Sequence, residues 1–139
     1  MDLTFYQTIK GVTAAQHVVK PGGPILAISE CSEGVGSHEF AGFLSNYRGA
    51  QEFLASIEDT PVQPDQWQLE KLALVALKHP LLFYTPGVQP EAMGELGKHS
   101  FHDAQEAVEH LLASLPSGAR IGLFPDGPYA LARVAKEDH

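Results

Sequence analysis

The sequence predicts an α/β fold, a three-layer α/β/α sandwich with a mostly parallel, Rossmann-like sheet. Short apolar runs bounded by Gly, Pro or polar residues alternate along the chain with helical segments of about three turns. Such alternation normally builds a parallel sheet that helices cover on both faces. With 139 residues, 44% of them hydrophobic, the chain is long enough for one core and too short for two. We therefore expect residues 1–139 to form a single α/β domain.

The first predicted elements are a helix over residues 3–19 and a strand over residues 24–29. Pro21, Gly22 and Gly23 stop the helix, and the strand is apolar at its centre, as in strands buried on both faces. Because the chain opens in a helix with no strand before it, we expect a domain cut from a longer protein. The apolar residues on one side of this helix are Phe5, Ile9, Val12 and Val19.

Further helices are predicted before the next strand. Ser37 can cap a first one, and a second short helix covers residues 51–57. Asp65 and Gln68 form a capping-box pattern ahead of a longer helix over residues 66–78. The apolar residues of this longer helix spread almost all round the helical wheel, so we expect it to lie between the sheet and another element.

The second half of the chain predicts two more strands, over residues 81–85 and 121–124. A small helix over residues 91–96 follows the first of them. Ser100 and Asp103 can cap a longer helix that ends at Pro116 and Gly118. Its apolar residues have the i, i+3, i+4, i+7 spacing of a packed face: Ala104, Ala107, Val108, Leu111, Leu112 and Leu115.

Composition and charge exclude several classes of function. Nine basic residues against seventeen acidic ones give a net charge of −8, which disfavours nucleic acid and anionic membranes as partners. No apolar stretch is long enough to span a membrane, and the N-terminus lacks a signal-peptide pattern. A single cysteine, Cys31, excludes an internal disulfide, and the seven histidines form no recognised metal-ligand motif. We expect a cytoplasmic protein whose own residues hold no metal.

A polar sector of the first helix is the best candidate for a binding site. Tyr6, Gln7 and Lys10 fall within about 100° of one another on the wheel, so a phenol, an amide and an ammonium can reach one point. An ammonium beside an amide suits a carboxylate, although a solvated helix face has the same pattern. Trp67, off the core face of its helix, is either a pocket wall, an interface anchor or a side chain packed under a loop.

The loop over residues 30–37 is a second candidate, because it joins the end of a strand to the start of a helix. Gly34 and Gly36 could admit a nucleotide or a phosphorylated metabolite, which makes a free-standing binding module the alternative function. The loop lacks the third glycine of a dinucleotide fingerprint and the Gly-Lys-Ser of a phosphate loop, and Glu30 and Glu33 would repel phosphate. No histidine stands at a motif spacing to activate Cys31 as a nucleophile.

Several segments, taken in order along the chain, resemble the C-terminal domain of the nickel-dependent lactate racemase family. The Tyr-Gln-x-x-Lys and Val-Lys-Pro-Gly-Gly elements together are the most specific part, and the resemblance covers essentially the whole chain. The segments are Tyr6-Gln7-Thr8-Ile9-Lys10, His17-Val18-Val19-Lys20-Pro21-Gly22-Gly23, Ser29-Glu30-Cys31-Ser32-Glu33-Gly34-Val35-Gly36, Gln66-Trp67-Gln68 and Lys78-His79.

The resemblance implies the C-terminal, substrate-binding domain of a two-domain racemase or epimerase of 2-hydroxy acids, with the active site between the domains. In that family a nickel-pincer nucleotide carries out hydride transfer and sits mainly on the N-terminal domain, which also supplies the acid/base histidines and the cofactor-bearing lysine. Carried over residue by residue, the resemblance makes Lys10 and Gln7 binders of the substrate carboxylate. It puts Tyr6 beside them and makes Trp67 a pocket wall. No catalytic residue falls in this chain, so we expect the domain alone to be inactive. Its partners would be the N-terminal domain and a small 2-hydroxy acid, unless it is an interaction domain whose Tyr6 face meets another protein.

Overall fold

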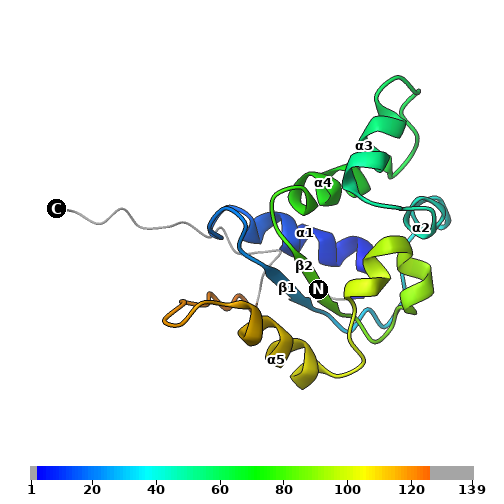
Figure 1. Ribbon diagram of the computed structural model, residues 1–139. Coiled ribbons are helices and arrows are strands. Elements are labelled where there is room, and N and C mark those ends of the chain that lie inside the picture. The colour runs from blue at the N-terminus through cyan, green and yellow to red at the C-terminus, as the bar shows by residue number, and fades with distance from the viewer. Residues whose placement is uncertain (1–2, 126–139) are drawn as a thin grey trace.

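The computed structural model describes residues 3–125, a mixed α/β structure with helices on either side of two strands (Figure 1). Among these residues no helix is long and apolar enough to cross a membrane. In chain order the elements are α1 (Phe5–Ala15), β1 (Ile25–Ile28), α2 (His38–Ser45), α3 (Ala50–Ile57), α4 (Gln66–Ala76), β2 (Leu81–Tyr84), the 3₁₀ segment η1 (Pro90–His99) and α5 (Ala104–Ser114).

The two strands confirm the predicted parallel pairing. Ile25 of β1 lies opposite Leu81 of β2, and Ile28 lies opposite Tyr84. The connection between the strands runs through α2, α3 and α4, which is the length that a parallel crossover needs. In Figure 1, α1 and α5 flank the strands on opposite sides. The fold is therefore α/β with a small parallel sheet.

The predicted third strand is wrong. Residues 121–124 are described by the structure and pair with neither β1 nor β2, and Leu123 is 85% exposed. A strand exists only through hydrogen bonds to a neighbour, so an apolar run without such a neighbour stays irregular. A two-stranded sheet in residues 3–125 does not amount to the three-layer, Rossmann-like sheet that the sequence predicts.

The core lies between α1, α4 and the sheet. Phe5 and Ile9 of α1 are fully buried, and the Phe5 ring lies 5.3 Å from that of Phe83 on β2. This confirms the packing face predicted for the first helix. On α4, Leu69 and Leu72 are fully buried, whereas Leu74 and the residue after the helix, Leu77, are about half exposed. The main neighbours of α4 are α1, α2 and α3. The expectation that this helix lies between the sheet and another element is therefore wrong, because α1 separates it from the sheet.

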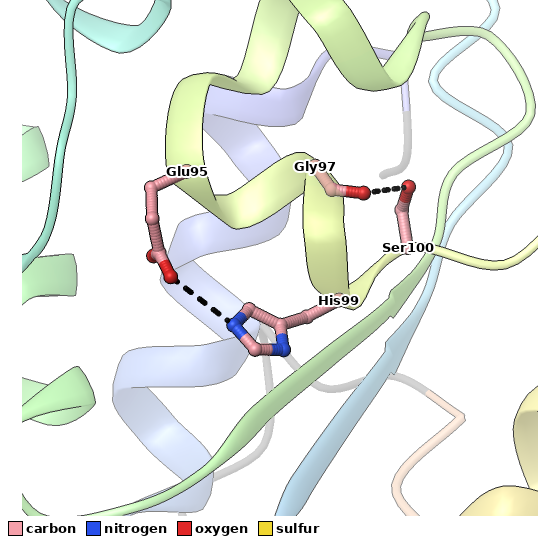
Figure 2. Close-up of polar contacts among 4 residues, drawn as sticks. All are labelled: Glu95, Gly97, His99 and Ser100. Carbon is pink, nitrogen blue, oxygen red and sulfur yellow. Dashed lines mark hydrogen bonds and ion pairs between the residues drawn. The ribbon is translucent and has the colours of Figure 1, made fainter.

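The end of η1 leads the chain to the outer edge of β2. Figure 2 shows His99 Nε2 lying 3.4 Å from Glu95 Oε1, one turn away, and the Ser100 hydroxyl donating to the Gly97 carbonyl at 2.8 Å. Ser100 therefore closes η1 and does not cap α5. The N–H of the next residue, Phe101, then donates to the carbonyl of Phe83 at 2.9 Å. Asp103 caps α5 as predicted, since its carboxylate accepts the Gln105 N–H at 2.9 Å.

Candidate functional site

The N-terminal ends of α1, α2 and α4 meet around an open, polar depression on the surface. Thr4 caps α1 and Ser37 caps α2, while Asp65 immediately precedes α4. The backbone N–H groups at such helix ends, together with these side chains, make the depression rich in hydrogen-bonding groups. It is lined by Thr4, Tyr6, Gln7, Glu33, Gly36, Ser37 and Asp65.

Tyr6 is held in place by contacts from three directions. Its N–H donates to the Val35 carbonyl at 3.0 Å, and its carbonyl accepts from Gln68 Nε2 of α4 at 2.9 Å. Its ring meets that of Phe40 on α2 edge to face, with 5.2 Å between centroids. The phenol therefore has a fixed position at the rim of the depression. Gln68, predicted as half of a capping box, serves instead to join α4 to α1.

The loop over residues 30–37 packs against α1 at this point. Gly36 has a φ of +134°, and a Cβ there would lie 3.0 Å from that of Tyr6. The glycine thus lets the loop pass close over the helix, which is a packing role. Cys31 is fully buried, and its sulfur lies 3.4 Å from the Thr8 hydroxyl. That environment is typical of a structural cysteine.

Asp65 links the start of α4 to the start of α2 through its carboxylate. Oδ2 accepts a hydrogen bond of 2.5 Å from the hydroxyl of Ser37. Partial burial and the negative charge of Asp65 together raise the pKa of the Tyr6 phenol. Tyr6 is therefore a neutral phenol around neutral pH. The sequence predicts Asp65 as the cap of α4, but its side chain makes no cap bond to that helix.

The two residues expected to bind a carboxylate lie side by side on α1. Gln7 is half-buried and lines the depression, and its N–H donates to the Thr4 hydroxyl at 3.3 Å. Lys10 follows three residues later on the helix and is exposed. In the part of the chain that the structure describes, no acidic side chain forms an ion pair with Lys10. Its ammonium is thus available to an anion beside the depression.

Trp67 lies in the first turn of α4 and is 48% exposed. The ammonium of Lys71 sits 4.1 Å from the centroid of its ring, a cation–π contact on one face. Trp67 does not line the depression, although it follows Asp65 by two residues. Its exposure rules out simple packing under a loop.

The structure brings Tyr6 and Gln7 together at the depression, with Lys10 next to them on the same helix, and leaves Trp67 to one side. Sequence reasoning overlooked Thr4, and it assigned Ser37 and Asp65 only as helix caps. Their polar side chains at helix starts were the available signal. The contact between Ser37 and Asp65, 28 residues apart in the chain, left no pattern in the sequence.

Fold and site together define a small α/β domain that presents a polar surface at its helix ends with an exposed lysine beside it. Comparison with known protein families identifies the family to which this domain belongs. Residues 1–131 match the lactate racemase C-terminal domain. The chain belongs to the lactate racemase family, as its C-terminal domain.

Two lactate racemases are among its relatives. The chain is 29% identical over 130 residues to the enzyme of Lactiplantibacillus plantarum, covering 91% of this chain and 31% of that protein. It is 26% identical over 136 residues to the enzyme of Thermoanaerobacterium thermosaccharolyticum, covering 96% and 32%. The solved lactate racemase apoprotein from the latter organism superposes with a TM-score of 0.79 at 25% identity, over 98% of this chain and 33% of that one. The chain thus spans about a third of the length of these relatives.

Proposed function

We propose that this domain binds the carboxylate of a 2-hydroxy acid for a lactate racemase-like enzyme, and that Lys10 and Gln7 form the carboxylate clamp. The observation that carries the proposal is an exposed lysine, without an ion pair among residues 3–125, one helical step from a glutamine that lines a polar depression. Family membership supplies the substrate class, because the relatives are lactate racemases.

The chemistry of racemisation explains why a clamp is needed. The carbon that bears the hydroxyl must become planar and then be rebuilt from either face, so the rest of the substrate has to stay fixed while that carbon changes. Side chains three positions apart on a helix have Cβ atoms about 5–6 Å apart, which lets an ammonium and an amide reach the two oxygens of one carboxylate. The ammonium supplies charge and the amide supplies orientation.

Tyr6 and Trp67 complete the proposed substrate surface. The Tyr6 phenol stands at the rim of the depression next to Gln7. Trp67 presents an exposed indole at the start of α4, where it can act as one wall of a site closed by a second domain. Both are substrate contacts in this proposal, and neither is a catalytic base.

The resemblance to the family assigns the nickel-pincer nucleotide of the proposed enzyme mainly to the N-terminal domain. Residues 3–125 contain no group of three or more His, Cys, Asp and Glu side chains that could hold a metal ion. When bound to the full enzyme, the cofactor would accept and return the hydride. We assign it, with the acid/base residues, to a partner N-terminal domain and derive no step through it from this chain.

The depression argues against the nucleotide-binding alternative. Two of the side chains that line it are carboxylates, Glu33 and Asp65, and no lysine or arginine does. A phosphate group, with up to two negative charges, would meet stronger repulsion there than a carboxylate with one. The single charge of Lys10, beside the depression on α1, matches a carboxylate, which favours a 2-hydroxy acid over a nucleotide.

Replacing Lys10 in the full-length enzyme tests the proposal. Loss of a charge-assisted bond costs about 1.5–3 kcal/mol, so Lys10→Ala should lower kcat/KM for racemisation by roughly ten- to a hundredfold. Lys98→Ala is the matched control, because Lys98 is an exposed lysine on η1, away from the depression. The proposal fails if the Lys10 variant stays within about twofold of wild type, or if both variants lose activity equally.

A further inference from the structure

The outer side of α4 carries an exposed stripe of alternating apolar and basic side chains. Trp67 is 48% exposed and Leu74 is 47% exposed, and the two lysines beside them are exposed as well. Lys78 continues the last turn of the helix, because its N–H donates to the Val75 carbonyl at 3.0 Å. The stripe falls within about 60° on a helical wheel and is about 16 Å long. We call it the α4 ridge, and it consists of Trp67, Lys71, Leu74 and Lys78.

The other sides of α4 are occupied within the domain. α1, α2 and α3 pack against this helix, and Leu69, Leu72 and Val75 are fully buried there. The ridge is the side that these three helices leave exposed. A half-exposed indole in line with a half-exposed leucine is typical of a surface that another protein segment covers, since tryptophan is enriched among the residues that anchor interfaces.

The lysines of the ridge indicate the chemistry of its partner. The ammonium of Lys71 lies 4.1 Å from the centroid of the Trp67 ring, and neither Lys71 nor Lys78 forms an ion pair with an acidic side chain of residues 3–125. A lysine lays its aliphatic stem along apolar neighbours and keeps its charge at the edge of the contact. The ridge therefore fits a surface that is apolar at its centre and carries carboxylates at its rim.

The place of the ridge in the fold indicates which partner this is. The chain matches a C-terminal domain and covers only 31% and 32% of the two related lactate racemases. In a protein of that length the preceding chain would enter at the start of α1, where Thr4 lines the depression. Trp67 stands in the first turn of α4, and the starts of α1 and α4 meet at this depression. A preceding domain that closes the depression thus reaches Trp67 first, and the rest of the ridge continues the same surface.

We propose that the α4 ridge is the docking surface for the N-terminal part of the full-length enzyme. That part covers Trp67 and Leu74 with apolar side chains and pairs Lys71 and Lys78 with carboxylates. The inference deepens the proposed function and rests on it, since it names the partner that closes the same site. A mixed apolar and charged contact is typical of interfaces between domains of one chain, which are more polar than permanent interfaces and permit relative motion.

Hydroxyl-radical footprinting of the 139-residue chain and of the full-length enzyme tests the docking surface. Trp67 is the single tryptophan of this chain, so mass spectrometry locates its oxidation directly. We expect its labelling rate to fall by about fivefold or more in the full-length enzyme, because covered side chains lose contact with solvent. Leu112 is the control, since it is half-exposed on α5, away from the ridge, and its labelling should not change.

Three outcomes of the footprinting would overturn the inference. The first is equal labelling of Trp67 in the two proteins. The second is a loss at Leu112 as large as that at Trp67, because the shielding would then not be specific to the ridge. The third is protection of Trp67 that grows with the concentration of the 139-residue chain alone, because a second copy would then be the occupant.

Reversing the charges of the ridge tests the carboxylates of the partner. Lys71→Glu combined with Lys78→Glu in the full-length enzyme should return Trp67 labelling to within about twofold of that in the 139-residue chain with the same substitutions, since carboxylates would then face carboxylates. Lys98→Glu is the matched control, because it reverses the charge of an exposed lysine on η1 and should leave Trp67 protected. Full protection in the double variant would overturn the inference.

The readout separates this inference from the proposed function. Lys10→Ala removes the carboxylate clamp and should leave the labelling of Trp67 as in the wild type. If the ridge is protected but Lys10→Ala leaves racemisation intact, the docking surface stands and the proposed function fails. If Lys10→Ala lowers racemisation but Trp67 is labelled equally in both proteins, the clamp stands and the docking surface fails.

Discussion

The helices α1 and α5 have the same length and pack against the same two strands, yet they are buried to very different depths. Each has eleven residues and begins at a side-chain cap, Thr4 for α1 and Asp103 for α5. Four residues of α1 are buried, whereas α5 buries only Ala107. Within residues 3–125, the apolar face of α5 is largely exposed, with Leu112 at 51%.

The difference comes from the layer behind each helix. α1 is covered by α4, which is itself backed by α2 and α3. α5 contacts the two strands, and the segment that follows it, residues 121–124, is itself exposed. Amphipathic spacing therefore identifies a helix and its apolar face, but the depth of burial depends on the next element out.

The largest loss of stability is expected from a substitution in α1. Phe5 is fully buried against Phe83, so Phe5→Ala should remove about 3–5 kcal/mol from the free energy of unfolding through lost burial and a residual cavity. Denaturant-induced unfolding of the chain measures this value. A loss below about 1 kcal/mol would show that α1 is not part of the central core.

A buried tyrosine also makes the free energy of unfolding depend on pH. Tyr47, in the core between α2 and α3, has its pKa raised to about 12 by burial and by the negative charge of Glu95. Its phenol ionises near pH 10 in the unfolded chain, so its contribution is fully present below that pH and is lost as the pH rises through about 12. Unfolding measured between these pH values should show a fall that Tyr47→Phe reduces. A fall of equal size in both proteins would contradict this assignment.

The smallest loss of stability is expected from a substitution in α5. Leu112→Ala removes a half-exposed side chain from a helix that tolerates alanine well, so the free energy of unfolding should change by no more than about 0.5 kcal/mol. The same unfolding assay as for Phe5→Ala gives a direct comparison. Similar losses for the two variants would mean that the two helices are equally buried.

Features set by local sequence could be predicted. Stop signals and apolar runs located both strands, and the general rule for βαβ connections predicted their parallel pairing. Ser37 and Asp103 cap the helices that follow them, as their sequence positions predict. The positions of Tyr6 and Gln7 at one rim follow from helical periodicity in the same way. Each of these predictions depends on residues close together in the chain.

Features set by distant contacts could not be predicted. The apolar run over residues 121–124 has the composition of a strand but no hydrogen-bonding neighbour. Asp65 has the sequence context of a cap, but its carboxylate bonds to Ser37, far earlier in the chain. Cap propensity is weak compared with such a contact, so tertiary structure decides the outcome.

The central claim is that Lys10 recognises a carboxylate, and equilibrium binding tests it most directly. The affinity of the full-length wild-type enzyme and of Lys10→Ala would be measured for a 2-hydroxy acid and for the corresponding uncharged 2-hydroxy amide. We predict that the wild type prefers the acid by roughly tenfold or more and that Lys10→Ala loses most of this preference. An undiminished preference for the acid in Lys10→Ala would contradict the account, because the charge that distinguishes the two ligands would then be recognised elsewhere.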